Sequence, residues 1–379
     1  MSGSLSLARI SGLLFFASYS IYYTPLLVRN RAFPRPPGAI WWFAGYIIIY
    51  ALNGFFVSDQ LFYEFRSGLV TLVQLIVLFW CASDILRDEK IARSFLLTYS
   101  IACVILSMGV VLRVPGLVVV LGDDDRLTAL GSNPNALAAA ITLAAVILVG
   151  LSLNRVFIHK IILLVMTLPL LIVMVTTGSR GAVLAFVSGC LPYFAFFWKS
   201  KQKLAAIIIG LVCAASVTYL AVNNPMFSER VQRSYYEGSL GSREAIIPTA
   251  IEMILERPVF GWHPIEMWYE LAIHTGWSGI SDAHNLFLHL LLEVGLVGTI
   301  PFFVGLCLCG WATWKARSGS LGLVPVASFL AILTTNMSGT GLYNKELWLI
   351  FALGVAANFA ASRKTFAVRY KGVPSRSPA

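Results

Sequence analysis

Long unbroken apolar runs are the feature that most constrains this chain. Several stretches of roughly 20 residues carry almost no charge, and a helix of that length crosses the hydrocarbon core of a bilayer. The strands of an outer-membrane barrel would alternate apolar and polar residues instead. Of the 379 residues, 58% are apolar and only 12% are charged, whereas a soluble domain carries about 25% charged residues. We therefore expect an all-α polytopic membrane protein.

The apolar runs divide into eleven candidate spans, and we expect about 11 to 12 transmembrane helices in all. The first span is the least regular because it contains Arg9 and a polar Ser-Tyr-Ser-Ile-Tyr-Tyr stretch. If it does not cross the membrane, the N-terminus lies on the opposite side. The candidate spans are 7–27, 39–57, 67–86, 94–112, 134–152, 156–176, 180–198, 204–222, 296–314, 321–341 and 344–361.

The basic residues orient these spans. Lysine and arginine total 28 against 18 acidic residues, which gives a net charge of +10. Basic proteins often bind nucleic acid, but no basic patch with interleaved aromatic residues stands apart from the spans. The positive-inside rule explains the excess, because one alternating set of turns holds 18 of the basic residues and the other set holds 10. The set expected in the cytoplasm is 28–38, 87–93, 153–160, 199–203, 315–320 and the tail 362–379.

One segment does not resemble a membrane span. Residues 223–282 are rich in charged and aromatic side chains and lie on the outward side by the charge count. Apolar residues at helical spacing predict a helix near 246–255, with Ser242 as a candidate N-cap and Pro258 as its stop. A functional loop is one interpretation, and a cover or docking surface is the other. The expected divisions are transmembrane helices over 1–222, the outward loop 223–282, transmembrane helices over 283–361 and a basic tail over 362–379.

Four short motifs on the outward side each open a helix. The first turn of a helix presents unpaired N–H groups and a partial positive charge, and both attract anions. Three of the motifs add an arginine, whose guanidinium group suits phosphate. Together they predict an anion site, for phosphate above all. The motifs are 126–135, 177–181, 241–244 and 282–285.

Local signals place the start of two of these helices. Asn133 is a candidate N-cap because Pro134 follows it at the first helical position. Asp282 is a candidate cap of a later helix, which would place His284 in the first helical turn. There the helix dipole favours the neutral imidazole, whereas Asp282 favours the charged one. We expect a neutral His284 to act as a general base.

Each candidate residue also has a plainer explanation, such as a snorkelling arginine, an ordinary helix cap or an interfacial histidine. Trp262 suits the face of a sugar ring or the anchoring of the loop at the membrane interface. No His, Asp or Glu spacing is typical of a metal site, so we expect no metal and no cofactor. The candidate catalytic residues are His284, Arg180 and Arg243, and the candidate binding residues are Arg126, Asn133, Asn135, Ser179, Ser242, Asn285 and Trp262.

The motifs and their order resemble the bacterial O-antigen ligase family, which shares a domain with O-antigen and exopolysaccharide polymerases. His284-Asn285, nine residues and Gly295-Leu-Val-Gly298 resemble the signature of that family. The turn 177–181 resembles its first arginine site. Ser242-Arg243, a helix and residues 256–261 resemble its loop segment with the second arginine, and 126–135 resembles an upstream Pro-Asn motif. The resemblance covers mainly residues 126–300.

The resemblance implies a metal-independent glycosyltransferase of the bacterial inner membrane with its active site facing the periplasm. Its partners would be an undecaprenyl-diphosphate-linked glycan, a lipid A core acceptor and membrane lipids, with no nucleic acid. A polymerase of the same family, whose acceptor is another carrier-linked repeat unit, is the alternative. A transporter of lipid-linked sugars is the alternative from another class. It is disfavoured because the spans contain almost no polar residues, with Gln74 and Glu293 as exceptions.

The charge distribution makes a topological prediction. Lys201→Cys should resist an impermeant thiol reagent in intact spheroplasts, because the turn 199–203 belongs to the cytoplasmic set. Ser239→Cys, in the outward loop, should react. Each is tested alone in a background that lacks the native cysteines, and labelling at position 201 but not at 239 would refute the topology.

Overall fold

The computed structural model describes residues 17–21, 35–121, 126–129, 133–153, 156–197, 203–236, 243–277 and 279–370. Met1–Pro37 and Gly38–Ala379 form two compact units. In the first unit, residues 17–21 are helical. All elements named below belong to the second unit.

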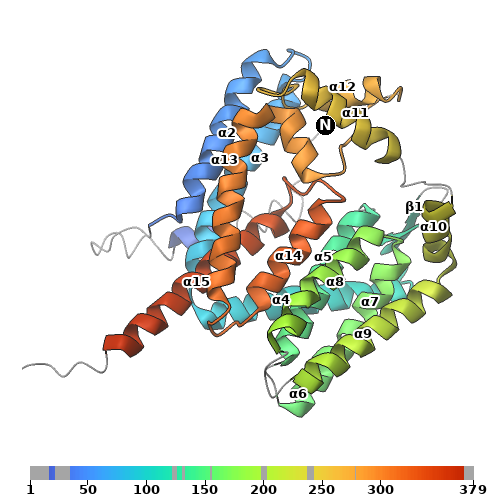
Figure 1. Ribbon diagram of the computed structural model, residues 1–379, viewed down its shortest axis with the longest axis vertical. Coiled ribbons are helices and arrows are strands. Elements are labelled where there is room, and N and C mark those ends of the chain that lie inside the picture. The colour runs from blue at the N-terminus through green and yellow to red at the C-terminus, as the bar shows by residue number, and fades with distance from the viewer. Residues whose placement is uncertain are drawn as a thin grey trace, which may run out of the picture. The chain divides into compact units, whose positions relative to one another are not determined.

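The second unit is built almost entirely of helices (Figure 1). A short antiparallel hairpin of β1 (Val118–Leu121) and β2 (Arg126–Ala129) is the exception, and the sequence patterns did not predict it. The helices are α2 (Gly38–Asn53), η1 (Gly54–Phe56), α3 (Phe62–Ile85), α4 (Glu89–Val111), α5 (Pro134–Leu153), α6 (Phe157–Val165), α7 (Thr167–Thr176), α8 (Arg180–Phe197), α9 (Lys203–Asn223), α10 (Pro225–Tyr236), α11 (Arg243–Glu256), α12 (Glu266–His274), α13 (Leu286–Ala316), α14 (Val324–Asn336) and α15 (Lys345–Tyr370).

The helices confirm the polytopic all-α class. Among the described residues, seven helices are long and apolar enough to cross a membrane, and three further apolar helices are shorter. These ten correspond to the expected spans from 39–57 onward. The expected span 7–27 lies largely outside the described residues.

Two expected boundaries are corrected. The span expected at 296–314 belongs to a longer helix, α13, that begins at Leu286. The span expected at 321–341 ends at Asn336, because a polar, glycine-containing segment follows. The span expected at 156–176 is confirmed: α6 and α7, which meet at Met166, together form one candidate span, Phe157–Thr176.

Side-chain caps decide where α5 and α13 begin. The Asn133 side chain accepts a hydrogen bond from the Asn135 N–H at 2.8 Å, so Asn133 is the N-cap, as expected. For α13 the expected cap, Asp282, is wrong. Asn285 is the N-cap, and its side-chain oxygen accepts from the Phe287 and Leu288 N–H groups at 2.9 and 3.2 Å. His284 therefore precedes the helix instead of lying in its first turn.

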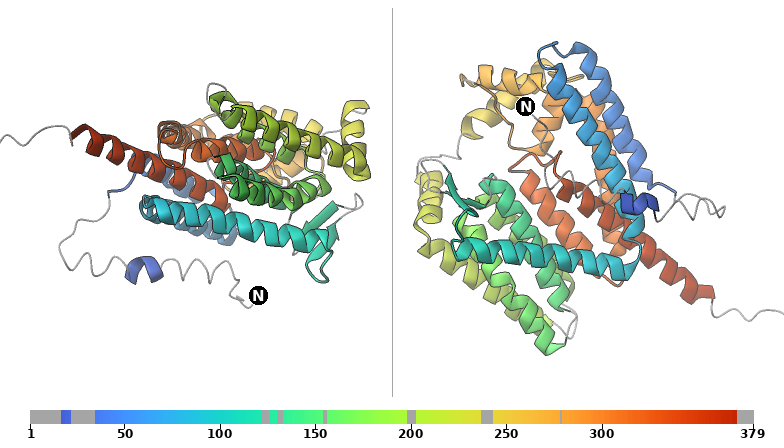
Figure 2. Two further views of the ribbon diagram at one scale, coloured as in Figure 1. Left: turned by 90° about the horizontal axis from the view of Figure 1, so that it is seen from below. Right: turned by 180° about the vertical axis from the view of Figure 1, so that it is seen from behind.

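The helices pack around three apolar clusters. One cluster joins α2, α3, α13 and α15, and a second joins α4, α5, α7, α8 and α14. Figure 2 shows α4, in cyan, running beside α5 and α7, which it contacts. The third cluster holds the outward loop together, because α11 and α12 pack on the first turns of α13. The candidate site lies where these clusters meet.

A break inside α13 seats the outward loop on the bundle. Gly295 has φ +60° and ψ −166°, which are not helical values. The segment 258–262 pairs with the opened backbone: Trp262 N–H donates to the Leu292 carbonyl at 2.6 Å, and Leu296 N–H donates to the Pro258 carbonyl at 2.9 Å. The two backbones approach so closely that a Cβ on Gly295 would lie 2.6 Å from the Gly261 nitrogen. Gly295 and Gly261 are therefore required by packing.

Gly295→Ala should destabilise the protein strongly. Alanine disfavours a positive φ, and its methyl group would meet the Val259 carbonyl; such strain costs about 1–3 kcal/mol before the clash is added. We expect the apparent Tm in detergent to fall by several degrees. Gly45→Ala in α2 is the matched control, because its Cβ would make an ordinary 3.6 Å contact with Pro301. Equal melting temperatures for the two variants would contradict the role of the break.

Candidate functional site

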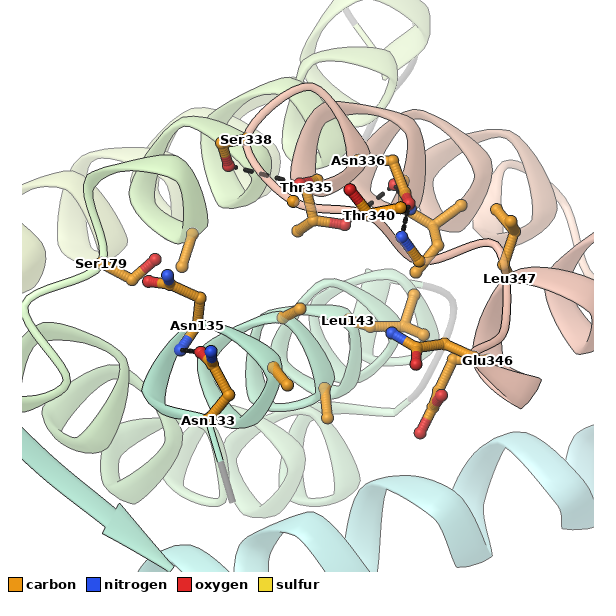
Figure 3. Close-up of a pocket in the computed structure, with 18 of the residues that line it drawn as sticks. Asn133, Asn135, Leu143, Ser179, Thr335, Asn336, Ser338, Thr340, Glu346 and Leu347 are labelled. Atoms are coloured by element: carbon orange, nitrogen blue, oxygen red, sulfur yellow. Dashed lines mark hydrogen bonds between the residues drawn. The ribbon is translucent and has the colours of Figure 1, made fainter. Parts of the chain in front are cut away.

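The N-terminal ends of α5, α8 and α15 and the C-terminal end of α14 meet around a cavity of about 330 Å³. Figure 3 shows Asn133, Asn135 and Ser179 across the cavity from Glu346 and Leu347. His284 also lines it. The cavity thus collects four of the residues singled out from sequence. They come from three motifs that lie far apart in the chain.

Arginine side chains gather beside this cavity. Arg243, at the start of α11, donates from Nη2 to the carbonyl of Ser338, a cavity-lining residue, at 2.8 Å. Arg180, at the start of α8, donates from Nη1 to the carbonyl of Arg230 at 3.3 Å. The charges of Arg180, Arg230 and Arg243 are close enough to repel one another. A site with three clustered cations is electrostatically prepared for an anion.

The Arg243 guanidinium has a donor without a partner among the described residues, namely its buried Nε. Burial, and then the neighbouring charge of Arg230, lower the pKa of Arg243, while Asp282 and Glu244 oppose this shift. A bound anion would relieve both the repulsion and the missing hydrogen bond.

His284 lies on the wall of the cavity in a left-handed conformation with φ +48°. Its Nδ1 faces Oδ2 of Asp282 at 3.4 Å. A proton on Nδ1 therefore leaves Nε2 free to accept another. Burial lowers the pKa of His284 below its ordinary value of 6.5; Asp282 raises it in part, and Arg243 lowers it further. The imidazole is accordingly neutral at pH 7.

Asp282 anchors this wall. Its Oδ1 accepts a hydrogen bond from Thr340 Oγ1 at 2.8 Å and lies 3.7 Å from Nδ1 of His289. Burial alone would raise the pKa of Asp282, but His289, Thr340 and His284 outweigh it and lower the value to about 2. Asp282 therefore stays ionised beside His284 throughout the physiological range.

The segment 337–344 completes the site, and sequence reasoning missed it. Arg243 binds the carbonyl of Ser338, and Nδ2 of Asn285 donates to the carbonyl of Met337 at 3.2 Å. Asn336 closes the turn by accepting from the Gly341 N–H at 2.7 Å. The signal was the polar string Asn-Met-Ser-Gly-Thr-Gly between two apolar runs.

Two of the predicted binding residues that the structure describes, Trp262 and Asn285, do not line the cavity. Trp262 is 8% exposed, donates from Nε1 to the Met253 carbonyl at 2.7 Å and lies under the Arg257 guanidinium. These contacts favour the anchoring interpretation of Trp262 over contact with a sugar. Ser242 lies outside the described residues. For Arg126 the structure describes the backbone, in β2, and not the side chain.

A second cavity of about 390 Å³ lies on the other side of the same wall. It shares Asp282, His284 and Thr340 with the first cavity. Trp268 and Trp277 line it, together with Tyr343. His284 thus separates a polar cavity near the arginines from an aromatic one. No group of three or more His, Cys, Asp or Glu side chains in the described part of the chain has the geometry of a metal site.

A comparison with known families agrees with this geometry. Residues 162–303 match the family model described as O-Antigen ligase. This segment of the chain is similar to the O-antigen ligase family. The resemblance expected from the motifs is thereby confirmed. No curated protein matches the chain.

The O-antigen ligase domain contains the charged part of the site. Arg180, Arg243 and His284 lie within the matched residues, as does the break at Gly295. Asn133, Asn135 and the segment 337–344 lie outside them. The protein is therefore a multi-pass membrane protein with a segment similar to O-antigen ligases, and helices that flank this segment complete its cavity.

Proposed function

We propose that this protein transfers a glycan from undecaprenyl diphosphate to a hydroxyl group of lipid A core at the periplasmic face of the bacterial inner membrane. The observation that carries the proposal is that an arginine cluster lies beside the small cavity that His284 lines. The cationic side suits the diphosphate of the donor, and the histidine suits the acceptor hydroxyl.

The arginines support the role of diphosphate binding. In the transfer, the bond between the anomeric carbon and the diphosphate oxygen breaks, and the leaving diphosphate takes the electron pair. Arg180 and Arg243 lie beside the cavity wall, where their charges would stabilise the negative charge that develops. Residues of the first turns of α5 and α8 also line the cavity, and the positive ends of these helix dipoles would favour an anion there.

His284 supports the role of general base. A sugar hydroxyl is a poor nucleophile, so its attack on the anomeric carbon gains from removal of its proton in the transition state. Nε2 of His284 would take this proton while Nδ1 keeps its contact with Asp282 at 3.4 Å. The Asp282 carboxylate then stabilises the imidazolium that forms, as the orienting acid does in a catalytic triad.

The two cavities suggest how donor and acceptor are arranged. The first cavity, beside the arginines, would hold the diphosphate end of the donor. The second, lined by Trp268 and Trp277, would hold acceptor sugars, whose C–H faces pack on aromatic rings. His284 lines both, so its imidazole would stand between the two reacting groups.

A polymerase that uses the same site is the second candidate. The donor half of the reaction would be unchanged, and only the acceptor would be another carrier-linked repeat unit. The string from His284 to Gly298 favours the ligase, since it resembles the ligase signature. In the structure, Gly295 of this string supports the loop and lines neither cavity. The two candidates are therefore distinguished by which acceptor the protein uses.

Arg243→Lys should lower glycan transfer by about 10²-fold. Lysine keeps the charge but cannot bind two phosphate oxygens and the Ser338 carbonyl with one planar group. Transfer is measured with purified protein and a carrier-linked glycan. Arg233→Lys is the control, because Arg233 is exposed and pairs with Glu229 on α10. Near-full activity in Arg243→Lys would contradict bidentate binding.

The rate of transfer should fall in acid as His284 becomes protonated. Because burial and Arg243 lower the pKa of His284, we expect the midpoint of this acidic limb below pH 6.5. His284→Gln should lose the limb and about 10²–10⁴-fold in rate. His159→Gln, an exposed position on α6, serves as the control. A His284→Gln variant that keeps both the rate and the limb would leave His284 with a structural role only.

A further inference from the structure

A chain of buried polar groups leads from the site into the helix bundle. His289 lies one turn inside α13 and is 0% exposed, and so is Glu293 one turn further. Nδ1 of His289 lies 3.7 Å from Oδ1 of Asp282, and Nε2 lies 3.6 Å from Oε1 of Glu293. The imidazole of His289 thus sits between two carboxylates, one of which also contacts His284.

The far end of the chain is held by tyrosines. Glu293 accepts a hydrogen bond from Tyr46 of α2 at 2.8 Å and another from Tyr343 at 3.2 Å. The Tyr343 hydroxyl also lies 3.2 Å from that of Tyr50. These hydrogen bonds hold the Glu293 carboxylate in one orientation, with Oε1 facing His289.

The geometry at His289 fits a doubly protonated ring. Both nitrogens face a carboxylate oxygen, and a neutral imidazole would direct a lone pair at one of them. Neither nitrogen has a hydrogen bond to another described group, so these two ion pairs are the polar contacts of the ring. The fully buried carboxylate of Glu293 would be costly without a cation beside it.

We propose that His289 is a positioning residue, which as an imidazolium bridges Glu293 and Asp282 and so holds Asp282 in place to orient His284. The inference rests on the proposed function. The groups that face Asp282 and His284 are His289 from α13, Arg243 from α11, and Thr340 and Tyr343 from the segment before α15. Of the two cations in this set, His289 is the buried one that pairs with Asp282 directly.

The test compares His289→Gln with His274→Gln. His274 is a matched control, because it has the same i,i+4 spacing to a carboxylate, Glu270, and lines neither cavity. We expect His289→Gln to lose about 10- to 10²-fold in kcat with KM little changed, since the reacting groups remain. The midpoint of the acidic limb of its pH–rate profile should rise by about one pH unit. Loss of a positive charge near His284 makes protonation of His284 easier. His274→Gln should match the wild type in both.

A spectroscopic measurement tests the bridge without activity. With ¹⁵N-labelled histidine at pH 7, the wild-type protein should show one ring with both nitrogens protonated, and Glu293→Gln should weaken or abolish that signal. The assignment follows from its loss in His289→Gln or, should that variant fail to fold, from its persistence when each of the other four histidines (His159, His263, His274 and His284) is replaced by Gln in turn. Absence of such a signal in the wild type would overturn the inference.

The outcomes separate the two proposals. If the wild type transfers glycan and His284→Gln does not, but His289→Gln keeps the wild-type rate and limb, only the positioning role is refuted. If the wild type transfers no glycan at all, the proposed function is refuted, and the spectrum still decides whether His289 bridges the two carboxylates.

Discussion

The break of α13 at Gly295 is the constraint on which the site depends. It frees the Leu292 carbonyl and the Leu296 N–H from regular helical bonding and gives both to the segment 258–262. In a bilayer protein such backbone groups must find partners within the chain. The exchange therefore ties the outward loop to a membrane helix, and α11 with Arg243 at its start is held near the first turns of α13.

Charge in the site is divided between two sides of one wall. Arg180, Arg230 and Arg243 form the cationic side. Their charges repel one another, and a bound anion would offset this repulsion. Asp282, His289 and Glu293 form a second set, in which the carboxylates and the imidazole compensate one another. His284 stands at the boundary. Its neutrality depends on both, because Arg243 opposes its protonation while Asp282 favours it.

Much of the fold could be predicted because its signals are local. Apolar length alone located ten helices, and the Asn133-Pro134 pair located the start of α5. The start of α13 could not be settled locally, since Asp282 and Asn285 are both good caps. A tertiary contact decides, because Thr340 binds Asp282 and leaves Asn285 to cap. The conformation of Gly295 likewise depends on Gly261, which is distant in sequence.

Several residues of the site could be predicted from sequence, but the segment and the contacts that bring them together could not. Arg180, Arg243, Asn133 and His284 carry recognisable chemistry at helix starts, and the structure gathers them. The segment 337–344 contributes two backbone carbonyls to the site, so its polar residue types mark a turn but do not indicate its role. The sequence does not indicate the role of His289. Its position between Asp282 and Glu293 becomes apparent only when α13 and the segment before it are placed in space.

The most direct test of the account is transfer by the purified protein. Carrier-linked glycan is incubated with the protein, with and without lipid A core, and the products are separated by size. We predict that glycan is attached to lipid A core and that no product forms without the core, with a rate about 10²–10⁴-fold lower in His284→Gln. Longer carrier-linked chains formed without the core would contradict the ligase assignment, and no transfer under either condition would contradict the proposed reaction.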